Sequence, residues 1–373
     1  MTIGQIAFLG SGETSLAGGR IFETLARLLP DPPRVAVLET PAGFELNSAT
    51  VAGRVADFLR TRLQNYSASV DVIPARKRGT AFSPDDPEIL QPLLQANLIF
   101  MGPGSPTYAV RQLQGTLAWD ILRARHRLGA MLVFASAATI SVSAWVLPVY
   151  EIYKVGQDVH SLPGLNLFSD FGVPLSFIPH WNNTDGGDDL DTSRCFMGME
   201  RFQQWCDMLP PDHTLVGLDE HTGLILDFEK NECTVSGVSS VSLVRECDPE
   251  IYAAGKTFPL NELGNFKLPV LEDGISSAAL ELIHNAMRTG EESPDADVLS
   301  LLDARQAARL AKDWSASDRL RNEIAAHGWT VTDTTEGPML ERSSNAPKKF
   351  RNTFLQANLK FIFRALTNER TII

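Results

Sequence analysis

Cysteine is scarce in this sequence, and its four copies form no CxxC pair and no spacing typical of a metal site: Cys195, Cys206, Cys233 and Cys247. This pattern favours reduced thiols in a cytoplasmic protein. The sequence also lacks an apolar run approaching about 18 residues, so we expect no membrane span. The first residues, Met1 to Glu13, contain neither the basic segment nor the apolar run of a secretion signal.

Positive charge is in deficit, because 33 Lys and Arg residues face 45 Asp and Glu residues and the net charge is −12. Such a balance argues against non-specific nucleic-acid binding by the whole surface, although it leaves a local basic patch open. Hydrophobic residues make up 44% of the 373 residues, which is enough for a large buried core. The length suggests about two domains.

Short apolar runs alternate with helical patterns in the first half of the chain. We expect strands over 5–9, 34–38, 70–73, 98–101 and 131–135, separated by helices over 20–29, 49–63 and 87–95 and by one that begins at Thr107. This alternation predicts an α/β fold with a doubly wound, mostly parallel sheet. Right-handed crossovers then bring the strand-end loops to one edge, where open α/β sheets bind ligands.

The chain divides into four predicted parts. Residues 1–247 form the α/β domain, and 248–275 form a linker, because that segment carries turn residues and no clear periodicity. Residues 276–345 form a small helical domain, since apolar side chains recur there at three- and four-residue steps. Residues 346–373 form a basic amphipathic tail.

Ser136 lies where a predicted buried strand meets a helix-like segment, and it is flanked by small residues on both sides. A serine at such a turn projects its hydroxyl at the sheet edge, and the N–H of Ala137 then faces a reacting oxygen. The loop after the strand at 98–101 contains Gly102 and Gly104, whose backbone N–H groups can approach a bound carbonyl closely. A plain tight turn is the alternative for that loop.

A nucleophilic serine needs a base and an acid that orients the base. His180 is the best base, because it ends an apolar strand and opens a polar loop; a purely structural histidine is the alternative. Glu151 is the best acid, fifteen residues after Ser136 in an aromatic segment where its carboxylate needs a partner. A salt bridge between Glu151 and Lys154 is the alternative.

These blocks, in this order, resemble the peptidase E and cyanophycinase family of serine hydrolases, which have a class I glutamine amidotransferase-like fold. The similar blocks are 102–106, 134–139, 165–180 and 216–223, within residues 5–246. The resemblance places Ser136 on the nucleophile and His180 on the base, and Glu151 close to the family's acidic triad member. It implies cleavage of an aspartyl or β-aspartyl peptide through an acyl-enzyme, with no cofactor and no metal.

The same resemblance suggests which cations could bind a substrate carboxylate, and Lys154 and Arg194 are the candidates. Two positions depart from the family pattern, because Phe134 and Ala138 stand where the family has glycines. The alternative is therefore a catalytically silent, hydrolase-like binding protein. A third alternative, amidotransferase-like chemistry at Cys195, is disfavoured because no strand–turn–helix context surrounds that cysteine.

The segments 301–324 and 328–338 resemble the C-terminal end of cysteinyl-tRNA synthetase. The ATP-binding motifs of the synthetase are absent, so the resemblance does not imply aminoacylation. Four arginines of this segment could contact RNA phosphates: Arg305, Arg309, Arg319 and Arg321. Acidic residues are interleaved with them, so a helical appendage that packs on the hydrolase domain or on a protein partner is the alternative. The oligomeric state stays open and includes a homodimer.

Overall fold

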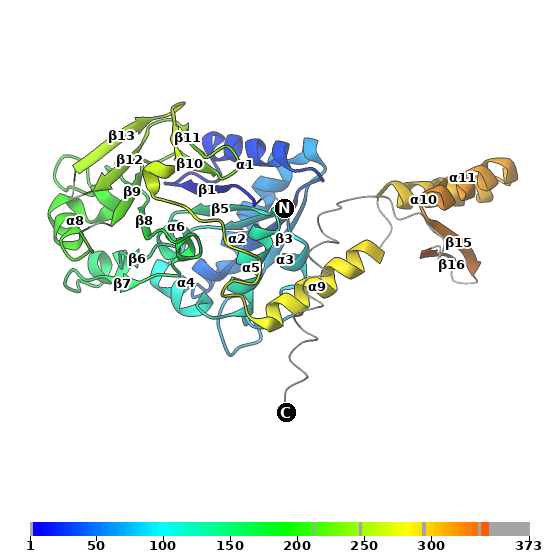
Figure 1. Ribbon diagram of the computed structural model, residues 1–373, viewed down its shortest axis with the longest axis horizontal. Helices are drawn as coiled ribbons and strands as arrows, with labels where there is room; N and C mark the ends of the chain where they lie inside the picture. The colour runs from blue at the N-terminus through cyan, green and yellow to red at the C-terminus, as the bar shows by residue number, and fades with distance from the viewer. Residues whose placement is uncertain (1–2, 212, 246–247, 293–295, 335–336, 343–373) are drawn as a thin grey trace. The chain divides into compact units, whose positions relative to one another are not determined.

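The computed structural model describes residues 3–211, 213–245, 248–292, 296–334 and 337–342 of the chain (Figure 1). The chain divides into two compact units, one of residues 2–283 and one that begins at His284. The first unit contains the predicted α/β domain and the second contains the predicted helical domain. We describe each unit by itself.

The first unit is built on an eight-stranded sheet with the order β14-β11-β10-β1-β5-β4-β2-β3. Its five parallel strands are β1 (Ile6–Leu9), β2 (Arg34–Leu38), β3 (Ser69–Ile73), β4 (Leu98–Met101) and β5 (Met131–Ala135). The antiparallel strands at one side are β10 (Thr222–Asp227), β11 (Glu232–Gly237) and β14 (Thr257–Pro259). The prediction of a mostly parallel α/β sheet is therefore confirmed.

Helices cover the sheet because alternate strand residues present apolar side chains to both of its faces. The helices are α1 (Leu16–Leu28), α2 (Ser48–Arg62), α3 (Gln91–Gln95), α4 (Pro106–Leu113), α5 (Leu117–Arg127) and α6 (Ala137–Ser141). Residues of α1 and α2, such as Phe22 and Leu59, form one core cluster with strand residues such as Leu9, Val37 and Val133. This packing fixes where each strand ends, and hence where the loops of the sheet edge lie.

A second, four-stranded sheet has the order β13-β12-β9-β8. Its strands are β8 (Leu175–Ile178), β9 (Thr214–Leu218), β12 (Ser240–Arg245) and β13 (Asp248–Ala253). Helix α8 (Gly198–Cys206) contributes Phe202 and Trp205 to the core cluster beside this sheet. Strands β6 (Trp145–Val146) and β7 (Leu162–Pro163) form a separate antiparallel pair in the first unit.

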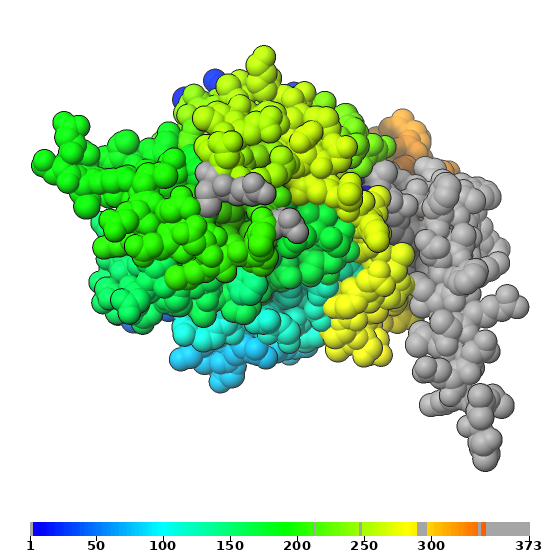
Figure 2. Space-filling view, turned by 60° about the vertical axis from the view of Figure 1, so that its left-hand side comes forward, coloured from blue at the N-terminus to red at the C-terminus, as the bar shows by residue number. Residues whose placement is uncertain are grey.

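The expectation of a linker over 248–275 is corrected by this topology. Strand β13 pairs with β12 and β14 pairs with β11, so the first part of the segment belongs to the two sheets. The guanidinium of Arg127 donates to the carbonyls of Val270, Leu271 and Asp273 at 2.9, 3.0 and 2.7 Å. Figure 2 shows the residues between β14 and α9 running along the surface of this unit. The segment is therefore an integral part of the α/β unit.

Among the residues that the structure describes, the second unit contains two helices and a hairpin after the end of α9 (Ser277–Glu292), the helix within which the division at His284 falls. Helices α10 (Ala296–Leu310) and α11 (Trp314–Ala326) pack with β15 (Trp329–Thr334), which pairs with β16 (Gly337–Arg342). The small core consists of Val298, Ile324, Trp329 and Val331. The helical character of this region is confirmed, and the predicted basic tail at 346–373 lies outside the described residues.

The helices of the described residues include none with the length and apolar character that crossing a lipid bilayer requires.

Candidate active site

Ser136 occupies the turn between β5 and α6 in a strained conformation, with φ 52° and ψ −118°. Backbone in this region costs an L-residue about 1–3 kcal/mol and persists only where the surroundings enforce it. Two hydrogen bonds hold the turn: the N–H of Ser136 donates to the Leu9 carbonyl at 3.3 Å, and that of Ala138 donates to the Gly102 carbonyl at 3.2 Å. This is the strand–turn–helix geometry that exposes a nucleophile.

Phe134 does not obstruct this turn, although the resembling family has a glycine at its position. The side chain is fully buried, and its ring lies 5.6 Å from that of Phe8, which stacks on Phe177 at 4.0 Å. The phenyl group therefore belongs to the aromatic core of the sheet. Ala138 is fully buried as well, so its methyl group fits the helix start.

Ser136 and His180 meet at the sheet edge, where the Ser136 Oγ lies 3.0 Å from the His180 Nε2. The other ring nitrogen, Nδ1, lies 3.0 Å from the Glu220 Oε1. A carboxylate accepts, so Nδ1 carries the proton and Nε2 is free to accept from the serine hydroxyl. The N–H of His180 donates to the Gly10 carbonyl at 3.2 Å, one residue beyond the carbonyl that holds Ser136.

Glu220, rather than Glu151, is the carboxylate beside His180, which corrects the sequence-based expectation. It lies in the turn between β9 and β10, and Asn183 donates to its Oε1 at 2.9 Å. Partial burial works to raise the pKa of Glu220, but the hydrogen bonds from Asn183 and His180 outweigh it and the pKa is lowered. The carboxyl group therefore stays ionised at neutral pH and can stabilise an imidazolium.

Glu151 lies instead on a π-helical turn, Tyr150–Lys154. Its Oε1 accepts a hydrogen bond from the Thr107 Oγ1 at 2.5 Å. Its Oε2 is buried and has no partner among the described residues. The Lys154 ammonium is exposed and lies 4.4 Å over the ring of Tyr150. The sequence indicated that the Glu151 carboxylate needs a partner, but not that Thr107 supplies it.

The glycine loop between β4 and α4 passes very close to another loop. Gly104 has φ 146°, and a Cβ atom on it would lie 2.0 Å from the Pro41 carbonyl oxygen. The neighbouring N–H of Ser105 donates to that same oxygen at 2.9 Å. Only glycine allows this approach. The same loop lies beside the start of α6, because the Gly102 carbonyl accepts from the N–H of Ala138.

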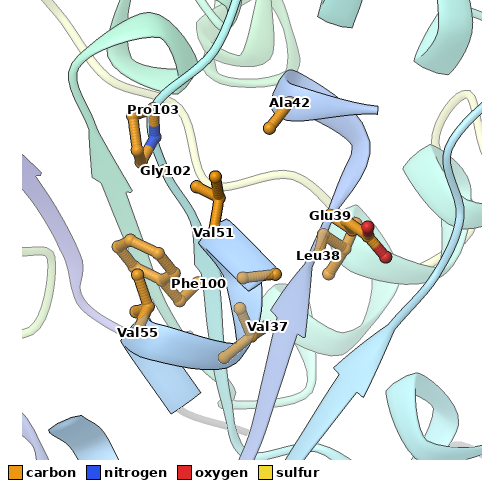
Figure 3. A pocket seen from close by; sticks show the side chains of 10 residues that line it. Val37, Leu38, Glu39, Ala42, Val51, Val55, Phe100, Gly102 and Pro103 are labelled. Atoms are coloured by element: carbon orange, nitrogen blue, oxygen red, sulfur yellow. The ribbon is translucent and has the colours of Figure 1, made fainter. Parts of the chain in front are cut away.

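A small cavity lies next to the same loop, lined by Gly102 and Pro103 together with apolar residues such as Val51 and Phe100 (Figure 3). Its volume is about 10 Å³. This is room for about one water molecule, so the cavity does not hold a substrate.

The residues after His180 form a second strained segment, because Arg194, Cys195 and Phe196 all have φ between 59° and 66°. The Arg194 guanidinium lies 4.0 Å over the Trp181 ring and donates to the Trp181 carbonyl at 3.0 Å. Burial lowers the pKa of Arg194, opposed by the charges of nearby carboxylates. Arg194 is thus held against Trp181, the residue that follows the candidate base His180.

Cys195 is buried beside His180, and its N–H donates to the His180 carbonyl at 3.1 Å. Burial, followed by the charge of Glu220, raises the pKa of its thiol to about 12. A thiol that stays protonated at neutral pH is not a nucleophile, so this geometry disfavours amidotransferase-like chemistry at Cys195.

Glu220, Asn183 and Thr107 are the site residues that the sequence reasoning missed. The block 216–223 signalled that a strand turns near the site, and Glu220 is one of two acids in that turn. The available signal was an acidic residue directly after a predicted strand, at the sheet edge where His180 also lies.

Comparisons with known proteins give separate matches for the two units. Residues 293–337 match the family model described as the cysteinyl-tRNA ligase anticodon binding domain. The cysteine–tRNA ligase of Methanosarcina mazei is 36% identical over 88 residues, which are 20% of this chain and 18% of that protein. The enzyme of Streptococcus thermophilus is 49% identical over 47 residues, 13% of this chain and 10% of that protein. The chain thus spans between a tenth and a fifth of the length of these curated relatives.

The α/β unit is similar to the crystal structure of a peptidase from an acI-B1 Actinobacterium. The TM-score is 0.55 at 21% sequence identity, and the match covers 69% of this chain and 97% of that chain. At this identity the comparison establishes a shared fold.

Proposed function

We propose that the α/β unit is a serine hydrolase that cleaves an amide bond of a peptide-like substrate. The observation that carries this proposal is the hydrogen-bonded series of Ser136, His180 and Glu220, with 3.0 Å at each of its two steps. The strained turn at Ser136 and the peptidase fold support it. We also propose that the protein is cytoplasmic, because the thiols of Cys195 and Cys233 are not in disulfides, which suits a reducing compartment.

In the proposed mechanism, the Ser136 Oγ attacks the substrate carbonyl carbon while the His180 Nε2 takes the hydroxyl proton. The carboxylate of Glu220 stabilises the imidazolium that forms. The N–H groups near Gly104 and Ala137 hold the oxyanion of the tetrahedral intermediate. His180 then gives its proton to the leaving amine, which departs and leaves an acyl-enzyme. Water, deprotonated by His180, releases the acid product and restores the serine.

The substrate that we favour is an aspartyl or β-aspartyl peptide, because two cations lie on segments that border the site. Arg194 packs on Trp181, the residue after His180, and Lys154 is exposed on the π-helical turn. Either can pair with a substrate carboxylate, Arg194 by two parallel hydrogen bonds and Lys154 as a point charge. A comparison of aspartyl with asparaginyl peptides would measure this preference.

A fluorophosphonate label tests the nucleophile directly. We expect it to modify Ser136, as shown by mass spectrometry of the digested protein, and to fail in Ser136→Ala and His180→Ala. Glu220→Gln should slow labelling by about 10⁴-fold, since an amide stabilises the wrong tautomer of the histidine.

Cys195→Ser serves as the control for this experiment, because the buried thiol has no role in the proposed steps. Absence of a label on Ser136, or undiminished labelling in His180→Ala, would refute the enzyme and favour a silent, ligand-binding descendant.

The match of residues 293–337 favours a second function, in which the C-terminal unit binds tRNA. Arg305 is 2% exposed and bound to Asp333, so it is not available to a phosphate. Arg319 and Arg321 are exposed and are the residues that we assign to such contacts.

A gel-shift titration of the full chain with tRNA at 50 and 200 mM salt tests this function. Binding that weakens steeply with salt, and weakens again in the double variant Arg319→Gln/Arg321→Gln, would support it. No shift at either salt concentration would instead favour a protein-binding appendage.

A further inference from the structure

A chain of side-chain hydrogen bonds joins the glycine loop to the π-helical turn. The N–H of Tyr108 donates to the Ser105 Oγ at 3.2 Å, and that oxygen lies 3.1 Å from the Thr107 Oγ1. Thr107 in turn donates to the Glu151 Oε1 at 2.5 Å. Because the single hydroxyl proton of Thr107 is given to the carboxylate, Ser105 must be the donor between the two hydroxyls. The chain therefore runs in one direction, from Ser105 through Thr107 to Glu151.

Ser105, the first residue of this series of hydrogen bonds, lies on the loop that would supply the oxyanion donors. Ser105 follows Gly104 directly and is 7% exposed. Its N–H is held by the Pro41 carbonyl, and the Gly102 carbonyl is held by the N–H of Ala138. The loop is thus tied by backbone bonds at two points, and the hydroxyl chain to Glu151 is a third tie made by side chains.

Glu151, the last residue of this series of hydrogen bonds, is unfavourable for the stability of the fold. Glu151 buries a carboxylate whose second oxygen has no partner among the described residues, and burying such a group is unfavourable. The residue also lies on a π-helical turn, a rare form that is frequent at functional sites. A neutral acceptor would serve a structural tie, whereas a charged acceptor makes a shorter and stronger bond and polarises the hydroxyls that precede it.

We propose that Glu151 is a positioning residue, which acts through Thr107 and Ser105 to fix the glycine loop for oxyanion stabilisation. This inference rests on the proposed function of the α/β unit. It gives Glu151 a role distinct from that of Glu220, because Glu151 acts on the loop and Glu220 acts on the histidine. The loop matters most when charge develops on the substrate oxygen, so its loosening should lower kcat and leave KM unchanged.

The test uses the full chain with three substitutions: Thr107→Val, Thr107→Ser and Glu151→Gln. We expect Thr107→Val to lower kcat and the fluorophosphonate labelling rate by about tenfold to a hundredfold, with KM within about twofold. Glu151→Gln should lower both rates less, since its amide oxygen can still accept from Thr107. Thr107→Ser should restore the rates. None of these changes should move the pH midpoint of the rate, whereas Glu220→Gln should.

Thr24→Val is the matched control, because it removes an exposed threonine hydroxyl of α1 whose hydrogen bond, within the part of the chain that the structure describes, goes to the Arg20 carbonyl. It should leave the rates unchanged. Unaltered labelling in both Thr107→Val and Glu151→Gln would overturn the inference. So would a displaced pH midpoint in Glu151→Gln, which would make Glu151 a partner of His180.

Hydrogen exchange of the peptide spanning 102–109 separates this inference from the proposed function. Faster exchange in Thr107→Val supports the positioning role, and unchanged exchange contradicts it, whether or not the wild-type protein labels. Failure of the wild-type protein to label Ser136 would refute the hydrolase alone.

Discussion

Backbone strain at single residues is concentrated around the candidate triad. Six of the ten non-glycine residues with a positive φ in the described part of the chain lie at this site: Ser136, His180, Arg194, Cys195, Phe196 and His221. Each costs about 1–3 kcal/mol, so the surrounding hydrogen bonds must stabilise them together. Because the strain is already present in the folded chain, the serine and the histidine are held in place before any substrate arrives.

Gly104→Ala tests how tightly the glycine loop is held. The new methyl group would meet the Pro41 carbonyl oxygen, and φ 146° is unsuitable for alanine, so the loop must move. We expect fluorophosphonate labelling to slow by at least about tenfold, because the oxyanion donors leave their positions. Gly53→Ala is the control: it lies in α2 with nothing within 4 Å of its Cβ position, and it should stabilise the fold by about 0.5–1 kcal/mol. Labelling that survives at full rate in Gly104→Ala would show that the loop is not required.

At the scale of elements, α10 is tied to the hairpin of the second unit by one buried cation. Arg305 is 2% exposed and makes two hydrogen bonds of 2.9 Å to the Asp333 carboxylate in β15. The Asp333 side chain is 41% exposed and has a second partner in Arg309 at 3.2 Å. The two members of this pair therefore differ, because Arg305 is buried and donates both of these hydrogen bonds to Asp333, whereas Asp333 is half-exposed and has a second cation beside it.

This difference predicts unequal costs for the two truncations. Asp333→Ala removes both of these hydrogen bonds from a buried guanidinium and should lower the stability of α10 and α11 by about 3 kcal/mol. Arg305→Met leaves a half-exposed carboxylate that still contacts Arg309, and should cost about 1 kcal/mol. Hydrogen exchange of α11 amides in the full chain measures both values. Equal costs, or a larger cost for Arg305→Met, would contradict the assignment.

The parallel strands could be predicted because they are short apolar runs bounded by glycine-rich turns, as at 98–101 and 131–135. Strand β13 was missed because it is an edge strand with mostly exposed residues, so no apolar alternation marks it. Ser136 and His180 were found from their own strand ends. Glu220 was not, because its contact with His180 depends on the pairing of β8 with β9 and of β10 with β1, which no local pattern reports.

At the scale of the whole molecule, the α/β unit buries two histidines that respond to pH. Burial lowers the pKa of His126 to about 4, against the opposing hydrogen bond to the Gly4 carbonyl, and burial lowers the pKa of His213 to about 4 as well. Both rings are neutral in the folded state at neutral pH. An unfolded chain protonates its histidines near pH 6.5, so it binds more protons than the folded chain between about pH 6.5 and 4.

The α/β unit should therefore lose stability as the pH falls through that window. At pH 5 each histidine accounts for a loss of about 2 kcal/mol relative to pH 7. Urea unfolding followed by circular dichroism at pH 7 and pH 5 measures the loss. The variant His213→Gln should show a smaller difference between the two pH values than the wild-type protein, and an identical difference would contradict the assignment.

The carbonyls of Leu9 and Gly10, at the end of β1, accept the N–H groups of Ser136 and His180. The proposed nucleophile and base are 44 positions apart in the chain. Both are nevertheless hydrogen-bonded to consecutive residues at the end of one central strand. If that strand moves, Ser136 and His180 move with it in the same direction, so the distance between them changes much less than their place in the molecule. Motion of the outer loops should therefore change the alignment of the reacting atoms very little. Substitutions in those loops should affect substrate access before they affect proton transfer.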